Sequence, residues 1–248
     1  MGLIYLVLMF ILSVVNIAVL TIVFRNQKNN YIFYTFFSII IANFGHMLLG
    51  FSESLEGAIL ANKVNYLGAS FLPLFMFFAL MQICRFKIFF VVRAFLVTLS
   101  FFVLFLSFTV GYSPVYYTSI EYVVQSGVGN YVATYGWGHT VFNVMMFGYV
   151  FADILIIVFA ILKRKNVSYK NIVAMTLTEA ISISSFLIAR RMENDMLVMP
   201  FVYVCDQILI LFICSNVKWY DVSYSVLESM KKDNSCAYVS FTSKNSFV

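Results

Sequence analysis

The chain has 248 residues, of which 62% are hydrophobic, 19% aromatic and only 11% charged. A soluble domain carries about 25% charged residues, so this composition excludes an ordinary water-soluble fold. The net charge of +5 does not indicate nucleic-acid binding, because the basic residues are scattered over loops and are not gathered on one face.

Seven apolar segments follow one another along the chain, each long enough to cross a bilayer. A membrane helix needs about 20 mostly apolar residues, because its backbone N–H and C=O groups must be satisfied without water. The sequence therefore predicts an all-α integral membrane fold, a seven-transmembrane helix bundle. The predicted spans are Leu3–Phe24, Tyr31–Phe51, Val64–Cys84, Val91–Val110, His139–Leu162, Ile172–Ala189 and Leu197–Val217.

Basic residues in the short loops predict the orientation of the bundle. Most of them fall on one side, where the positive-inside rule places the cytoplasm: Arg25, Lys28, Arg85, Lys87, Arg93, Lys163, Arg164, Lys165, Lys170 and Lys218. The opposite side has Lys63, just before the third span, together with Arg190 and Arg191. We therefore expect the N-terminus outside and the C-terminus inside.

The loop between the fourth and fifth spans, residues 111–138, differs from the others. It contains no Lys or Arg and one acid, Glu121. Two runs rich in Tyr, Val and Thr flank the segment Ser126-Gly127-Val128-Gly129-Asn130, which is typical of a turn. The pattern predicts a small extracellular β-hairpin between helices 4 and 5.

The character of the sequence changes after Lys218. Val222, Val226, Leu227 and Met230 form one helical stripe, and the run CAYVSF that follows resembles the first strand of a soluble domain. We predict a transmembrane domain over residues 1–220. Residues 221–248 are expected to form a cytoplasmic linker helix and the start of a truncated soluble module.

No enzyme motif is present in the sequence. It lacks a Gly-rich phosphate loop, a His-Glu-x-x-His pair and a Gly-x-Ser-x-Gly elbow. The two histidines fall on different spans, and the seventh span has no lysine for a retinal Schiff base. We therefore expect no catalytic residue, no cofactor and no metal.

Polar side chains within the predicted spans are the informative feature, because they are costly in a bilayer and face a bundle interior or a cavity. Helical spacing gathers them into one stripe per span: Asn43, His46, Gly50 and Glu53; His139, Asn143 and Asp153; Glu179 and Ser182; Tyr203, Asp206 and Gln207. Two interpretations stay open. The stripes line a ligand cavity open to the outside, or they hydrogen-bond between helices and hold the bundle together.

His46 and Glu53 are expected nearer the outer surface, where a ligand could reach them. With them, the candidate ligand contacts are Tyr66, His139, Asn143, Arg190, Arg191 and Tyr203. The residues expected to be buried between helices are Asn43, Asp153, Glu179, Asp206 and Gln207. Arg190 and Arg191 are either neutralised by Glu193 and Asp195 or form an anion site at the cavity mouth.

One segment resembles a known family. Residues 62–84 contain Tyr66-Leu67-Gly68, then Pro73, then Phe78-Ala79-Leu80. This order resembles the third span of the seven-helix N-terminal sensor region of bacterial histidine kinases, a region also found ahead of diguanylate cyclases. The hairpin segment leading into the fifth span and the tail YDVSYSVLESM resemble the same family.

The resemblance implies a sensory input region without its output, in a bacterial cytoplasmic membrane. Residues 1–220 would be the sensor domain, and residues 221–248 would lead into a truncated, PAS-like output module. An external or membrane-borne small ligand would shift the packing of the bundle, with Gly68 and Pro73 as candidate bend points. The seventh helix would pass the change to a kinase or cyclase module that acts as a homodimer. Two alternatives remain: a small secondary transporter with Asp153, Glu179 and Asp206 as a proton relay, and an intramembrane enzyme.

Overall fold

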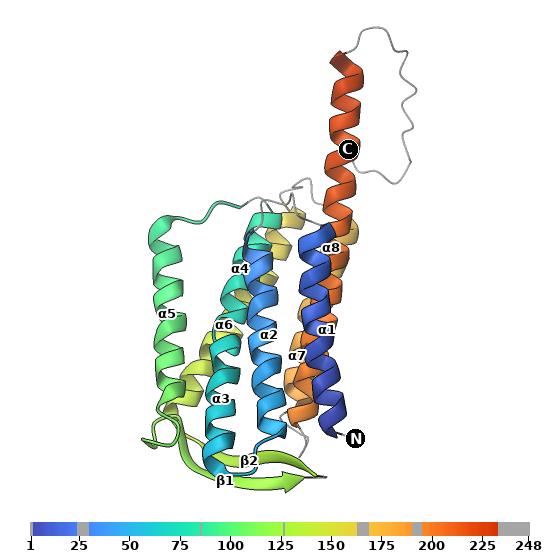
Figure 1. Cartoon of the computed structure of the whole chain (residues 1–248). Coiled ribbons are helices and arrows are strands. Elements are labelled where there is room, and N and C mark those ends of the chain that lie inside the picture. Colours follow the sequence, from blue (N-terminus) through green and yellow to red (C-terminus); the bar gives the residue numbers. More distant parts are fainter. Residues whose placement is uncertain are drawn as a thin grey trace.

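The computed structural model describes residues 2–23, 30–84, 86–125, 127–162, 169–189 and 195–232. Helices in these ranges form a bundle with a two-stranded hairpin across one end (Figure 1). The N-terminus lies at the hairpin end, and the last helix projects from the opposite end (Figure 1). The elements are α1 (Gly2–Val23), α2 (Asn30–Gly50), α3 (Leu55–Ala69), α4 (Leu72–Ile83), α5 (Phe90–Phe108), β1 (Tyr117–Gln125), β2 (Val128–Tyr135), α6 (Trp137–Leu162), α7 (Tyr169–Ala189) and α8 (Asp195–Lys232).

Six segments in the described part are long and apolar enough to cross a membrane, α3 and α4 together forming one of them. Large apolar side chains face outward from these helices. On α5, at the edge of the bundle, Phe90 is 81% exposed and Phe105 is 69% exposed. The exposure of such a surface to water is unfavourable, whereas lipid tails solvate it. The predicted membrane helix bundle is confirmed.

The predicted third span is wrong in its start and in its continuity. Helix α3 begins well before Val64, because the Ser54 side chain caps its N-terminus by accepting a hydrogen bond from the Gly57 backbone N–H (3.2 Å). The chain then breaks between Ala69 and Leu72, and Pro73 occupies the first turn of α4, where a missing N–H costs least. Lys63 consequently lies inside α3 and not before it.

The predicted place of Glu53 on the polar stripe of the second span is also wrong. Helix α2 ends at Gly50, and Ser54 already has the extended backbone of a helix cap. Glu53 therefore lies in the connection between α2 and α3, exposed, and no longer follows the helical spacing set by Asn43 and His46.

Helices α2 and α3 approach each other closely at two glycines. A Cβ added at Gly45 would collide with the backbone of Asn65, and one at Gly68 would collide with the Ser38 carbonyl and the Ala42 backbone. The Asn65 amide also donates to the Ala42 carbonyl (3.2 Å). Small residues let membrane helices pack at backbone distance, so this contact fixes α3 against α2.

We predict that Gly45→Ala or Gly68→Ala destabilises the bundle by about 1–3 kcal/mol, since the new methyl group overlaps backbone atoms that cannot yield. Gly148→Ala on α6 is the control, because its Cβ would meet nothing within 4 Å. Thermal unfolding in detergent should show a lower midpoint for the first two variants only. Equal midpoints for all three would contradict the close contact.

The predicted hairpin is confirmed. Strands β1 and β2 pair antiparallel around Gly127, whose φ of +75° suits a residue without a Cβ. The hairpin lies against the end of α2, where the Tyr122 hydroxyl donates to the Ser52 carbonyl (2.7 Å). Gly129 lies so close to the Leu49 and Ser52 carbonyls that a Cβ would collide with both. The strands therefore cover that end of the bundle.

Helix α8 is continuous from Asp195 to Lys232 and contains Pro200 near its start. The predicted seventh span and the predicted helix after Lys218 are thus one helix, which leaves the bundle at the end opposite the hairpin (Figure 1). Residues 233–248, where the sequence predicts a strand, lie outside the described residues.

Candidate functional site: a polar cavity between the helices

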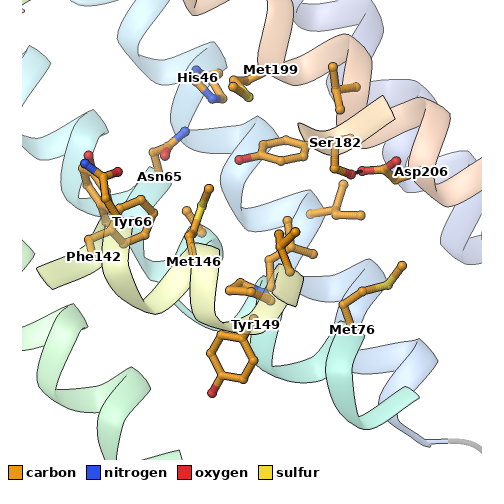
Figure 2. A pocket seen from close by; sticks show the side chains of 18 of the residues that line it. His46, Asn65, Tyr66, Met76, Phe142, Met146, Tyr149, Ser182, Met199 and Asp206 are labelled. Atoms are coloured by element: carbon orange, nitrogen blue, oxygen red, sulfur yellow. Dashed lines mark hydrogen bonds between the residues drawn. The ribbon is translucent and has the colours of Figure 1, made fainter. Parts of the chain in front are cut away.

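A cavity of 420 Å³ lies inside the bundle, with walls from α2, α3, α4, α6, α7, α8 and both strands. Figure 2 shows Tyr66 and Phe142 on one side of it and Ser182 with Asp206 on the other. Eight of the thirteen predicted site residues line it: His46, Tyr66, His139, Asn143, Asp153, Glu179, Tyr203 and Asp206. Ser182, which belongs to a predicted polar stripe, lines it too.

The remaining predicted residues lie elsewhere. Glu53 is exposed and does not line the cavity. Asn43 and Gln207 belong to a separate buried cluster with α1. In it, the Asn43 amide donates to the Ser13 hydroxyl (2.6 Å), and the Asn16 amide donates to the Gln207 side-chain carbonyl (3.2 Å). Asn43 and Gln207 therefore agree with the interpretation in which polar side chains hydrogen-bond between helices and hold the bundle together. Arg190 and Arg191 lie outside the described residues.

A chain of hydroxyl groups joins the hairpin to α3 at one end of the cavity. The Tyr131 hydroxyl donates to the Asn62 side-chain carbonyl (2.8 Å), Tyr117 lies 3.2 Å from Tyr131, and Tyr66 lies 3.1 Å from Tyr117. Since each hydroxyl has one proton, Tyr117 must donate to Tyr131 and Tyr66 to Tyr117. Burial raises the pKa of Tyr117 well above its usual range, so its hydroxyl stays protonated near neutral pH.

Aromatic rings pack around this hydroxyl chain. The Tyr135 ring stacks on His139 with centroids 4.0 Å apart, and Tyr66 meets Phe142 edge to face at 5.3 Å. The amide nitrogen of Asn143, one turn along α6, lies 3.1 Å from His139 Nδ1. Rings held in this way form a rigid, amphipathic wall, which suits a binding site more than a mobile loop would.

Three carboxyl groups lie at another part of the cavity. Asp153 is 3% exposed, Glu179 7% and Asp206 8%, each from a different helix. Glu179 interacts electrostatically with both aspartates, and the Ser182 hydroxyl donates to Asp206 Oδ2 (2.9 Å). No lysine or arginine is among the described residues that line the cavity.

Several buried polar atoms that belong to lining residues have no hydrogen-bond partner among the described residues. They are His46 Nδ1, Asn62 Nδ2, Asn143 Oδ1, Asp153 Oδ1 and Asp206 Oδ1. A buried polar group left unpaired costs about 1–3 kcal/mol, so groups of this kind are normally satisfied by water or a ligand. The walls are thus suited to a polar guest. Within the described residues no cluster of three potential metal-binding side chains occurs.

Sequence reasoning missed several lining residues: Asn62, Asn65, Tyr117, Tyr131, Tyr135 and Tyr149. One helix face carries four of the lining residues at helical spacing: Asn62, Asn65, Tyr66 and Ala69. This spacing was not recognised because the predicted third span began only at Val64. The hairpin tyrosines alternate along β1 and β2, but no sequence pattern shows that a hairpin folds back over a bundle.

A family model of the N-terminal 7TM region of histidine kinases matches residues 6–221, so the chain belongs to this family. No curated protein matches it. The chain is therefore a multi-pass membrane region with a sensory and not a catalytic role, in agreement with the resemblance in residues 62–84.

We predict that Tyr131→Phe loosens the hairpin. The change removes the donor to Asn62, whose two side-chain polar atoms then both lack a partner, at a cost of about 1–3 kcal/mol. Hydrogen exchange of the β1 and β2 amides should become faster. Tyr112→Phe is the control, because the Tyr112 ring is exposed and contacts Lys63 through its face. Unchanged exchange in Tyr131→Phe would contradict the role given to the hydroxyl chain.

Proposed function

We propose that the chain is the sensory input region of a bacterial signalling protein whose ligand binds in the 420 Å³ cavity. Occupancy would change the packing of the bundle, and α8 would carry the change to a histidine kinase or diguanylate cyclase module that acts as a homodimer. Residues 1–220 are the sensor and residues 221–248 begin the path to the output. His46, Tyr66, His139, Asn143 and Tyr203 are the proposed ligand contacts.

The observation that carries this proposal is the course of α8. Near its start the helix lines the cavity with Met199, Tyr203 and Asp206. It then continues without a break to Lys232, beyond the end of the bundle (Figure 1). A rigid helix that touches the ligand site at one end and leaves the membrane region at the other is suited to transmit a displacement.

The proposed orientation places the N-terminus and the hairpin outside. Lys87 lies in the connection between α4 and α5, and Arg93 lies in the first turn of α5, both at the end opposite the hairpin. This distribution follows the positive-inside rule, with α8 leaving on the cytoplasmic side. We infer that α7 supplies the seventh span.

We predict that an impermeant maleimide labels Val124→Cys in intact cells and labels Lys87→Cys only after the membrane is permeabilised. Both positions are exposed, and they lie at opposite ends of the bundle. Native cysteines are first replaced by alanine. The reverse pattern of labelling would place the hairpin in the cytoplasm and remove the outer ligand from the proposal.

The proposed mechanism needs two packings of the bundle with different affinity for the ligand, because a ligand with equal affinity for both states shifts neither. The break at Ser70 and Phe71, between Gly68 and Pro73, supplies a hinge in the cavity wall, since Leu72 and Pro73 line the cavity. Pro200 offers a second weak point in α8, because it removes one hydrogen bond from that helix.

A cavity-filling substitution tests this coupling without a known ligand. Val150→Phe on α6 adds volume inside the cavity, and Val158→Phe adds the same volume on the exposed face of the same helix. Spin labels at positions 87 and 223 report the place of α8 relative to the bundle. We expect Val150→Phe to change their separation by about 1–2 Å, the size of a helix shift, and Val158→Phe to leave it unchanged. Equal distance distributions in the two variants would contradict coupling through α8.

A secondary transporter is the second candidate, favoured by the three buried carboxyl groups that have no basic partner among the described lining residues. Such groups suit a proton relay. Proton flux into vesicles that contain the purified chain, lost in Asp153→Asn, would favour the transporter. Absence of flux would leave the sensory proposal as the better account.

A further inference from the structure

We propose that the part of the cavity around Asp153, Glu179 and Asp206 is a binding site for an organic cation, a protonated amine with an apolar body. The inference rests on the proposed sensory function and gives the chemical class of its ligand. It is carried by the charges in the cavity wall, by the polar atoms that lack partners, and by the rings next to the carboxyl groups.

The charge of the wall has one sign. Three acidic side chains line the cavity, and no Lys or Arg is among the described lining residues. Each acid is more than nine-tenths buried. Ionised carboxylates in such a place repel one another and have lost their hydration, so they need a nearby positive charge to remain ionised. A bound cation supplies that charge, whereas an anion would add to the repulsion.

The unpartnered atoms favour a ligand that donates hydrogen bonds. Asp153 Oδ1 and Asp206 Oδ1 are acceptors with no partner among the described residues. A primary ammonium group carries three donors and no acceptor, which suits these two oxygens. The unpartnered side-chain oxygen of Asn143 lies about three helical turns before Asp153 on α6, so it is available to another part of the ligand. The unpartnered amide nitrogen of Asn62, 3% exposed and on another wall of the same cavity, is a donor left for an acceptor elsewhere on the ligand.

A tyrosine lies one helical turn from each aspartate, on the side nearer the hairpin. Tyr149 precedes Asp153 on α6, and Tyr203 precedes Asp206 on α8, and all four line the cavity. Both helices run away from the hairpin end, so each tyrosine lies about one turn nearer the hairpin than the aspartate that follows it. Aromatic faces attract ammonium groups, and more strongly where water is excluded.

The remaining walls suit an apolar body. Met76, Met146 and Met199 come from three different helices and line the cavity with flexible thioethers (Figure 2). Such side chains adapt to ligands of varied shape. Apolar side chains including Ile39, Val202 and Ile210 complete these walls. A cavity of 420 Å³ lies within the range of small-molecule sites.

Binding of two amines and their neutral analogues to the purified full chain in nanodiscs tests the proposal. The probes are phenethylamine and hexylamine, compared with 2-phenylethanol and hexanol, and binding is followed by calorimetry. We expect saturable binding of at least one amine, at least tenfold tighter than that of its alcohol. Asp153→Asn and Asp206→Asn should each weaken the amine at least tenfold, because a charge-assisted hydrogen bond is lost. Glu121→Gln, an exposed acid on β1, should leave the affinity unchanged.

Three results would overturn the cation site. In the first, neither amine binds more tightly than its alcohol. In the second, the aspartate variants bind amines as tightly as the parent chain does. In the third, sodium chloride competes with the amine at equimolar concentration, which would indicate a site for an inorganic cation. The labels at positions 87 and 223 separate this failure from that of the sensory function. If an amine binds and the distance between the two labels stays unchanged, the result would support the cation site and contradict signalling through α8. If the alcohols changed the distance between the two labels and the amines did not, the result would contradict the cation site and support the sensory function.

Discussion

The structure depends on one constraint, the absence of water as a hydrogen-bond partner within a bilayer. Every polar group inside the bundle must find a partner in the protein or in a guest. The contact of α1, α2 and α8 meets most of this demand internally. Ser13, Asn16, Asn43 and Gln207 bond to one another there, although Asn43 Oδ1 has no partner among the described residues. The cavity does not meet this demand, because five of its lining residues keep an unpaired polar atom among the described residues. The same chemical groups thus hold helices together at one place and line a cavity with unpaired atoms at another.

The hairpin makes this cavity a defined space and not a gap between helices. It is fixed at the end of α2 through Tyr122 and at α3 through the hydroxyl chain that ends on Asn62. Both anchors use atoms of the connection or helix that follows α2, and α3 is itself held against α2 by Gly45 and Gly68. The hairpin and α3 are therefore attached at or next to α2, while α8 touches the cavity and leaves the bundle.

The sequence predicted the parts of the fold that follow from periodicity. Apolar length located the membrane helices, and two runs rich in Tyr, Val and Thr around a turn segment located the hairpin. Helical spacing on four spans selected residues that share one cavity, such as His139, Asn143 and Asp153. The prediction was wrong where a capping side chain decides at which residue a helix begins. Ser54 starts α3 inside a run that lacks a clear apolar beginning, and this moved Lys63 into a helix and Glu53 out of one. The contribution of Tyr117 and Tyr131 depends on how the hairpin folds back, which is a tertiary contact and leaves no local signal.

The proposed function requires, as its central claim, that molecules outside the membrane can reach the cavity. A cysteine in place of Ser182, which lines it, tests this most directly in intact cells, with the native cysteines replaced by alanine. Ser100→Cys on α5 is the matched control, because Ser100 is fully buried and does not line the cavity. The account predicts that an impermeant cationic thiol reagent added outside modifies position 182 and not position 100. Modification of position 182 only after permeabilisation, or not at all, would contradict it.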